Sequence, residues 1–188
     1  MRRIHPAGLY EAICPLAEGA DSYGYQFRVA DERGNLTTMH DPYSFPPLFS
    51  EFDLFLHGQG KHWKIYDKLG AQLRTVNGVR GVNFGVWAPN ATSVSVIGDF
   101  NGWDGRRHPL RKHIPSGVWE LFVPEIGAGE KYKFRVNQGH QFVDKIDPYG
   151  FAAEVPPRTA SIVADLGTYH WHDEGWLDYR RTNSQLER

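Results

Sequence analysis

The segment from Phe84 to Trp103, FGVWAPNATSVSVIGDFNGW, constrains the fold more than any other part of the chain. Apolar residues alternate with smaller or polar ones up to Ala88 and again over residues 93–96. This period of two is typical of strands that bury one face. Pro89 cannot donate to a strand ladder, so the first strand should end near Ala88. The segment therefore predicts two β-strands joined by a turn and followed by a loop that ends on Trp103.

Charge and cysteine content exclude several classes of protein. The 188 residues include 21 basic and 22 acidic side chains, a net charge of −1, whereas nucleic-acid binders usually carry a basic excess. Cys14 is the single cysteine, which rules out an internal disulfide and favours a reducing cytosol. The amino-terminal residues lack the apolar run of a signal peptide, and no run is long enough to span a membrane. We therefore expect a cytoplasmic protein that contacts neither nucleic acid nor membrane.

The first half of the chain predicts a small β-region and a helical connector. Residues 1–41 are expected to be a partial first β-domain whose three strands, over 9–13, 23–29 and 36–39, form a minimal sheet. Residues 42–75 are expected to be the connector. It begins with prolines and contains a helix from Phe49 to His57, with Ser50 as a candidate N-cap, and then one or two further helical turns.

From Ala71 the chain predicts a β-sandwich. Short strands separated by turn residues, including Asn77-Gly78, are typical of an immunoglobulin-like fold. The strands are expected over residues 71–76, 81–87, 93–98, 117–123, 130–137, 141–145 and 160–164. Residues 76–167 would be this domain, with Trp87 and Trp119 in structural roles, and the polar tail 168–188 would be a linker. The fold class is thus mostly β: an immunoglobulin-like sandwich preceded by a partial second sheet and a short helical connector.

Several motifs in this order resemble the family-48 carbohydrate-binding module. The matching pieces are residues 84–111, SGVWELFVP (116–124), EKYKFRV (130–136) and DKIDPYGFAAEVPPRTASIV (144–163). The upstream segments 40–71 and 78–91 resemble the region that joins the two amino-terminal sandwiches of bacterial 1,4-alpha-glucan (glycogen) branching enzymes. The resemblance covers roughly residues 20–183. It implies an amino-terminal region of such an enzyme without its catalytic barrel.

The resemblance also implies that this chain alone is not an enzyme. Branching enzymes cleave an α-1,4 glucan bond and form an α-1,6 branch, which requires two carboxylates about 5 Å apart. In the family both lie on the barrel. We therefore expect no catalytic residue and no cofactor in this chain. His170 and His172 would share a strand face, but they do not supply a full zinc ligand set, so no metal is expected.

Four residues are candidates for contact with an α-1,4 glucan such as glycogen or a maltooligosaccharide. The Trp103 ring could lie against the apolar face of a glucose unit, or it could cap the sandwich core. Lys133 alternates with Tyr132 and Phe134, so its ammonium group would face away from the core and could bind sugar oxygens. Phe142 is the nearest equivalent of a second Trp that glycogen-sensing relatives carry, and Asn137 could donate to hydroxyls.

Two alternatives to glucan binding stay open. The region could be a structural spacer that packs on the catalytic barrel of the parent enzyme without binding sugar. The apolar helix around Phe52, Phe55 and Leu56 would then be a docking surface. The parent could also be an isoamylase-type debranching enzyme, which carries the same module.

Overall fold

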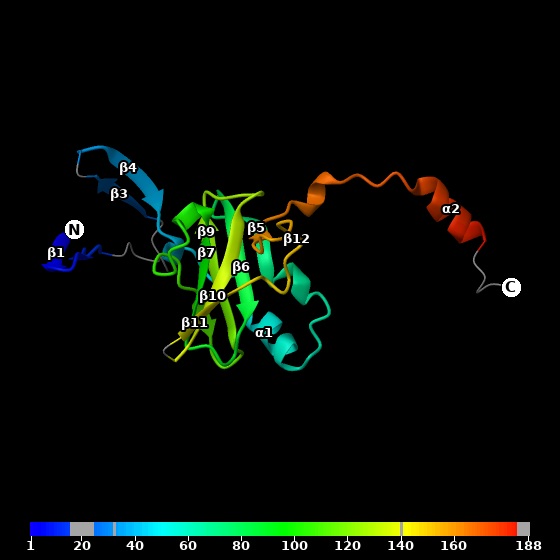
Figure 1. Ribbon diagram of the computed structural model, residues 1–188, viewed down its shortest axis with the longest axis horizontal. Helices are drawn as coiled ribbons and strands as arrows, with labels where there is room; N and C mark the ends of the chain where they lie inside the picture. The colour runs from blue at the N-terminus through cyan, green and yellow to red at the C-terminus, as the bar shows by residue number, and fades with distance from the viewer. Residues whose placement is uncertain (16–24, 32, 140, 184–188) are drawn as a thin grey trace. The chain divides into compact units, whose positions relative to one another are not determined.

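The computed structural model describes residues 1–15, 25–31, 33–139 and 141–183 (Figure 1). It divides into two compact units, Met1–Pro46 (unit 1) and Pro47–Arg188 (unit 2). In unit 1, β1 (Arg2–His5) pairs with β2 (Leu9–Glu11), and β3 (Gln26–Ala30) pairs with β4 (Leu36–His40), both antiparallel. A 3-10 helix, η1 (Pro42–Ser44), follows β4.

The prediction of one three-stranded sheet in unit 1 is wrong. Strand β1 was not predicted, because its sequence RRIH has no apolar alternation and it becomes a strand only by pairing with β2. The four strands form two separate two-stranded sheets. The predicted hairpin connection at Asp31–Asn35 is confirmed, since Asp31 Oδ1 accepts the Asn35 backbone N–H at 2.8 Å. Part of the strand predicted over 23–29 lies outside the described residues.

Unit 2 contains a β-sandwich of two antiparallel sheets, so the predicted fold class is confirmed. The first sheet has the order β5-β6-β9-β8. In the second sheet β10 pairs with β7 along one edge and with β11 and β13 along the other, and β12 extends β13. The strands are β5 (Gly70–Val76), β6 (Val79–Trp87), β7 (Ser93–Gly98), β8 (Arg111–His113), β9 (Val118–Pro124), β10 (Lys131–Gln138), β11 (Gln141–Lys145), β12 (Ala152–Ala153) and β13 (Ser161–Ile162).

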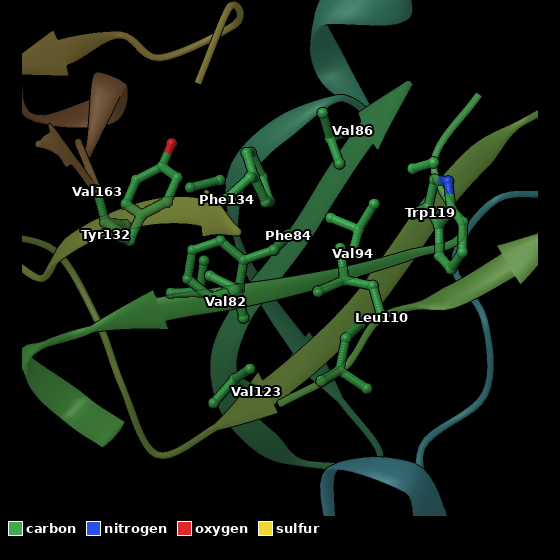
Figure 2. Packing of buried hydrophobic residues seen from close by; sticks show 14 residues of the cluster. Val82, Phe84, Val86, Val94, Leu110, Trp119, Val123, Tyr132, Phe134 and Val163 are labelled. Atoms are coloured by element: carbon green, nitrogen blue, oxygen red, sulfur yellow. The ribbon is translucent and has the colours of Figure 1, made fainter. Parts of the chain in front are cut away.

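The predicted strand alternation produces the sandwich core (Figure 2). Val82, Phe84 and Val86 of β6 point between the sheets, where they meet apolar residues of β7, β9 and β10. Trp119 is buried, as predicted, and its indole N–H donates to the Ala88 carbonyl at 2.9 Å. Trp87, in contrast, lies outside the core with 54% of its surface exposed. Its indole N–H donates to the Ser116 carbonyl at 3.1 Å.

A covering segment, residues 47–69, lies on the outer face of the first sheet. It contains helix α1 (Glu51–Gly58) and the short 3-10 helix η2 (Ile65–Asp67). The predicted Ser50 N-cap is confirmed, because its hydroxyl accepts the Asp53 backbone N–H while the Asp53 carboxylate accepts the Ser50 N–H. Phe49 and Leu69 pack with Val118 of β9 on this outer face.

The polar tail contains regular structure that the sequence analysis did not predict. The 3-10 helix η4 (Leu166–Thr168) ends where the tail begins, and helix α2 (Glu174–Thr182) lies within the segment predicted to be a linker. Acidic Glu174 in the first turn and Arg180 and Arg181 in the last turn match the helix dipole. Within the described part of the chain, neither helix has the length and apolar character needed to cross a membrane.

Candidate functional site

The outer face of the second sheet collects three of the four predicted site residues. Tyr132 and Phe134 of β10 are buried in the core, so the alternate residues Lys133, Arg135 and Asn137 face outward. Strand β11 runs beside β10 (Figure 1) with Phe142 opposite Asn137 and Asp144 opposite Arg135. Directly opposed residues share a face. We call the surface formed by Lys133, Arg135, Asn137, Phe142 and Asp144 the β10 face.

On the β10 face, hydrogen bonds fix the polar groups of two predicted site residues. The Lys133 ammonium donates to the Thr159 hydroxyl at 2.8 Å, and the Asn137 amide donates to the Ser93 hydroxyl at 2.7 Å. An ammonium group has three N–H donors and a carboxamide has two. Each contact therefore orients the group and engages one donor, which leaves further donors for a ligand.

The Phe142 ring is 58% exposed and is held by a side chain that the sequence analysis missed. The Arg135 guanidinium carbon lies 4.4 Å from the Phe142 ring centroid. Arg135 also binds Asp144 through two hydrogen bonds, Nε to Oδ1 at 2.7 Å and Nη2 to Oδ2 at 2.9 Å. These bonds raise the pKa of Arg135, and they lower the pKa of Asp144. Both groups are therefore charged at neutral pH. No signal in the sequence marks this contact, because it depends on the register that places Arg135 opposite Asp144 in the folded hairpin.

Trp103 occupies a conformation that a bulky residue rarely adopts. Its φ is +60°, in the left-handed region, directly after Gly102 at +65°. The Trp103 backbone N–H donates to the Gly98 carbonyl at 2.9 Å, and the indole N–H donates to Asp99 Oδ1 at 2.9 Å. Strain of this kind persists where surrounding contacts enforce it, often at binding sites.

The loop around Trp103 is built on a buried amide. Asn101 is almost completely buried. Its side-chain oxygen accepts the Gly98 N–H and its amide donates to the Val96 carbonyl, both at 2.9 Å. Of the loop's two aromatic rings, Phe100 is the one that packs on the core, where it stacks with Phe84. Trp103 is thus placed by its own hydrogen bonds and remains partly exposed.

The loop and the β10 face are neighbours. A Cβ atom added at Gly105 would lie 2.9 Å from Arg135 Cδ, so the backbone just after Trp103 runs along the Arg135 side chain. The structure therefore brings Lys133, Asn137 and Phe142 together on one face, with the loop that carries Trp103 beside it. Exposed aromatic surface next to unused N–H donors is suited to a ligand that has both apolar faces and hydroxyl groups.

Residues 68–150 match the family described as carbohydrate-binding module 48 (isoamylase N-terminal domain). The matched residues contain strands β5 to β11 of the sandwich. Over 183 residues, 96% of its length, the chain is 50% identical to the 1,4-alpha-glucan branching enzyme GlgB of Rhodopirellula baltica, and it covers 24% of that protein. It is also 50% identical over 191 residues to the GlgB of Synechocystis sp., again over 24% of the relative.

The match confirms the predicted resemblance to the amino-terminal region of branching enzymes. The chain spans about a quarter of the length of these curated relatives. Among solved structures, a pullulanase from Bacillus acidopullulyticus matches 60% of this chain and 13% of its own, with 24% identity and a TM-score of 0.47.

Proposed function

We propose that this chain is a non-catalytic α-glucan-binding accessory region of a cytoplasmic glycogen branching enzyme. The parent enzyme would cleave α-1,4 glucan and transfer the fragment to form α-1,6 branches, and this region would bind its glucan chains. One observation carries the proposal: Lys133, Asn137 and Phe142 share one accessible face, and the Trp103 loop borders it.

The chemistry of this surface fits a glucan. The C–H face of a glucose unit is apolar and packs against an aromatic ring, which Trp103 and Phe142 supply. The hydroxyls around the ring need donors and acceptors. Lys133 and Asn137 offer N–H donors whose directions are already set by Thr159 and Ser93. The near-zero net charge of the chain also suits an uncharged polysaccharide.

Affinity electrophoresis through gels that contain glycogen tests the proposal. The wild-type chain should be retarded. Removal of an aromatic contact lowers affinity by about tenfold. Trp103→Ala and Phe142→Ala should therefore each reduce the retardation strongly. Trp63→Ala is the matched control, since Trp63 is 86% exposed but lies in the covering segment of the other sheet. Wild-type mobility that glycogen does not change would refute glucan binding by this chain.

A second candidate function is that of a spacer that docks on the catalytic barrel of the parent enzyme. Phe52 and Phe55 of α1 are both largely exposed, which favours a protein partner for this helix. The barrel of a branching enzyme supplied in trans should then increase the solubility of the wild-type chain. The Phe52→Ser/Phe55→Ser double variant should not respond. A wild-type chain that the barrel leaves unchanged would argue against docking.

A further inference from the structure

Arg135 contacts both parts of the proposed glucan site. Its guanidinium covers one side of the Phe142 ring at 4.4 Å, and its aliphatic part lies against the backbone at Gly105, two residues after Trp103. The side chain is only 24% exposed, although it projects from the outer face of the sheet. Arg135 therefore lies between the two structural elements that carry the aromatic rings, strand β11 and the loop after β7.

The Arg135 side chain is itself fixed. Asp144 accepts two parallel hydrogen bonds from it at 2.7 and 2.9 Å, a bidentate geometry that sets the plane of the guanidinium as well as its position. Because a stacked cation and ring attract each other, a fixed guanidinium plane also restricts the Phe142 ring. The chain of contacts runs from Asp144 through Arg135 to Phe142.

We propose that Arg135 is a positioning residue of the glucan site, which presents one face of Phe142 to the sugar and sets the separation between Phe142 and the Trp103 loop. This inference rests on the proposed glucan binding. A ring that is ordered before the ligand arrives loses little conformational entropy on binding, so affinity increases without an added contact. Since Arg135 covers one side of Phe142, only the opposite side is available for stacking on a glucose unit.

The role requires the planar guanidinium and not only a positive charge. A lysine ammonium can pair with Asp144, but it has no flat fork to hold two parallel bonds and stack on a ring. Arg135→Lys should therefore retain only part of the wild-type affinity for glycogen. Arg135→Met, which keeps the aliphatic length, should retain less. The matched control is Arg106→Met. Arg106 makes a similar ion pair with Asp104, in the loop after β7, but its side chain is 90% exposed.

Glycogen-affinity electrophoresis of the full chain, with the apparent dissociation constant read from retardation, tests the role. Arg135→Met should weaken binding roughly fivefold, Arg135→Lys less, and Arg106→Met hardly at all. Thermal unfolding should show folded protein in each case. The decisive measurement is the double variant Arg135→Met/Phe142→Ala. Its affinity should equal that of Phe142→Ala alone, because a positioning residue has no effect once the ring that it positions is gone.

The outcomes separate this inference from the proposed function. Weak binding by Trp103→Ala together with wild-type affinity for Arg135→Met would overturn the role of Arg135 alone. Losses that multiply in the double variant would also overturn it, since Arg135 would then act independently of Phe142. A wild-type chain that glycogen does not retard would overturn both.

Discussion

The two outer faces of the sandwich start from the same strand alternation and end with opposite properties. On the first sheet, the covering segment lies over the outward-facing residues, and Glu120 of β9 is only 1% exposed. On the second sheet, the β10 face remains accessible, with Phe142 as its most exposed ring. The covered face buries a carboxylate, whereas the accessible face presents cations and an aromatic ring.

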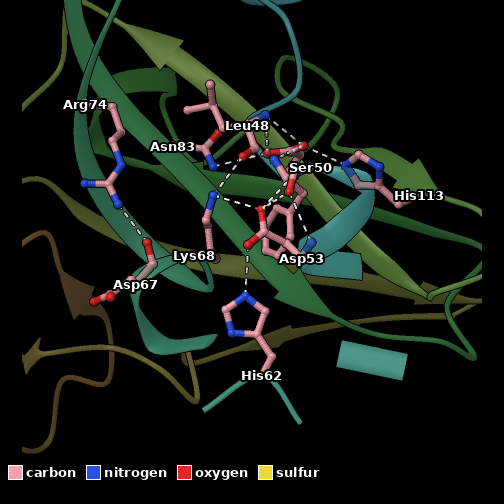
Figure 3. Close-up of polar contacts among 11 residues, drawn as sticks. Leu48, Ser50, Asp53, His62, Asp67, Lys68, Arg74, Asn83 and His113 are labelled. Atoms are coloured by element: carbon pink, nitrogen blue, oxygen red, sulfur yellow. Dashed lines mark hydrogen bonds and ion pairs between the residues drawn. The ribbon is translucent and has the colours of Figure 1, made fainter. Parts of the chain in front are cut away.

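The Glu120 carboxylate is used entirely inside the protein, and its partners Leu48, Asn83 and His113 are labelled in Figure 3. It accepts the backbone N–H groups of Leu48 and Phe49 at 3.1 and 3.2 Å and the Asn83 amide at 3.2 Å, and it pairs with His113 Nε2 at 2.6 Å. On the β10 face, Lys133, Arg135 and Asn137 each keep N–H donors beyond their contacts with described residues. The comparison teaches that a charged residue on an outward strand position indicates binding only where no other segment consumes its hydrogen bonds.

Removal of the buried carboxylate should give the largest effect on stability. Glu120→Ala leaves two backbone N–H groups, the Asn83 amide and His113 without their acceptor, which should lower the free energy of unfolding by about 3–5 kcal/mol. Urea unfolding measures this loss. Glycogen retardation at low temperature should stay near the wild-type value, because the β10 face lies on the other sheet. Trp103→Ala should instead weaken glycogen retardation and leave the free energy of unfolding near the wild-type value.

Glu51→Ala is the control for this prediction, since Glu51 lies exposed in the first turn of α1. Glu51→Ala should lower the free energy of unfolding by less than about 1 kcal/mol. An unfolding midpoint for Glu120→Ala equal to that of the wild type would show that the covering segment is held by its apolar contacts alone.

A smaller effect is expected where the covering segment approaches the first sheet most closely. A Cβ atom at Gly85 of β6 would lie 2.9 Å from the Lys68 carbonyl oxygen and 3.2 Å from the Phe49 ring. Gly85→Ala should therefore push the segment outward and cost about 1–3 kcal/mol in urea unfolding. Gly58→Ala at the end of α1 is the matched control, because nothing lies within 4 Å of the added atom. Equal stability of the two variants would contradict close packing at Gly85.

The sequence predicted the strands that have an apolar side and missed those that do not. Strands β6 and β9 follow from alternation, and α1 follows from Ser50 and its apolar residues. Strand β8, of sequence RKH, carries no such pattern and exists only because it pairs with β9. Tertiary pairing of this kind cannot be read from local residue preferences.

The same distinction applies to the candidate site. Lys133 could be placed on an outward face, because it alternates with the core residues Tyr132 and Phe134 of its own strand. The contact between Arg135 and Asp144 depends on the register of β10 against β11, which only the folded hairpin determines. The left-handed backbone of Trp103 likewise depends on bonds to Gly98 and Asp99 that residue type alone does not predict.

The smallest expected effect is a dependence of stability on pH that distinguishes two buried carboxylates. Burial by itself would raise the pKa of Glu120, but hydrogen bonds from His113, Phe49 and Leu48 outweigh it and hold the pKa below the ordinary value of 4.5. Burial raises the pKa of Asp147, where the Tyr132 hydroxyl at 2.5 Å and the Tyr149 N–H at 2.8 Å compensate only in part. The two groups should therefore respond to acid with opposite signs.

For Glu120 the unfolded chain binds the proton more readily, so its contribution is complete above the unfolded pKa and is lost as pH falls through the folded pKa. In urea unfolding at stepped pH, the stability difference between wild type and Glu120→Gln should be constant from pH 7 to 5 and should narrow below about pH 4.5. The folded pKa of Asp147 is raised, so the folded state binds the proton more readily. The free energy of unfolding of the wild type should therefore rise relative to that of Asp147→Asn as acid protonates Asp147. Parallel pH profiles for wild type and Glu120→Gln would show that the ionised carboxylate does not hold the covering segment.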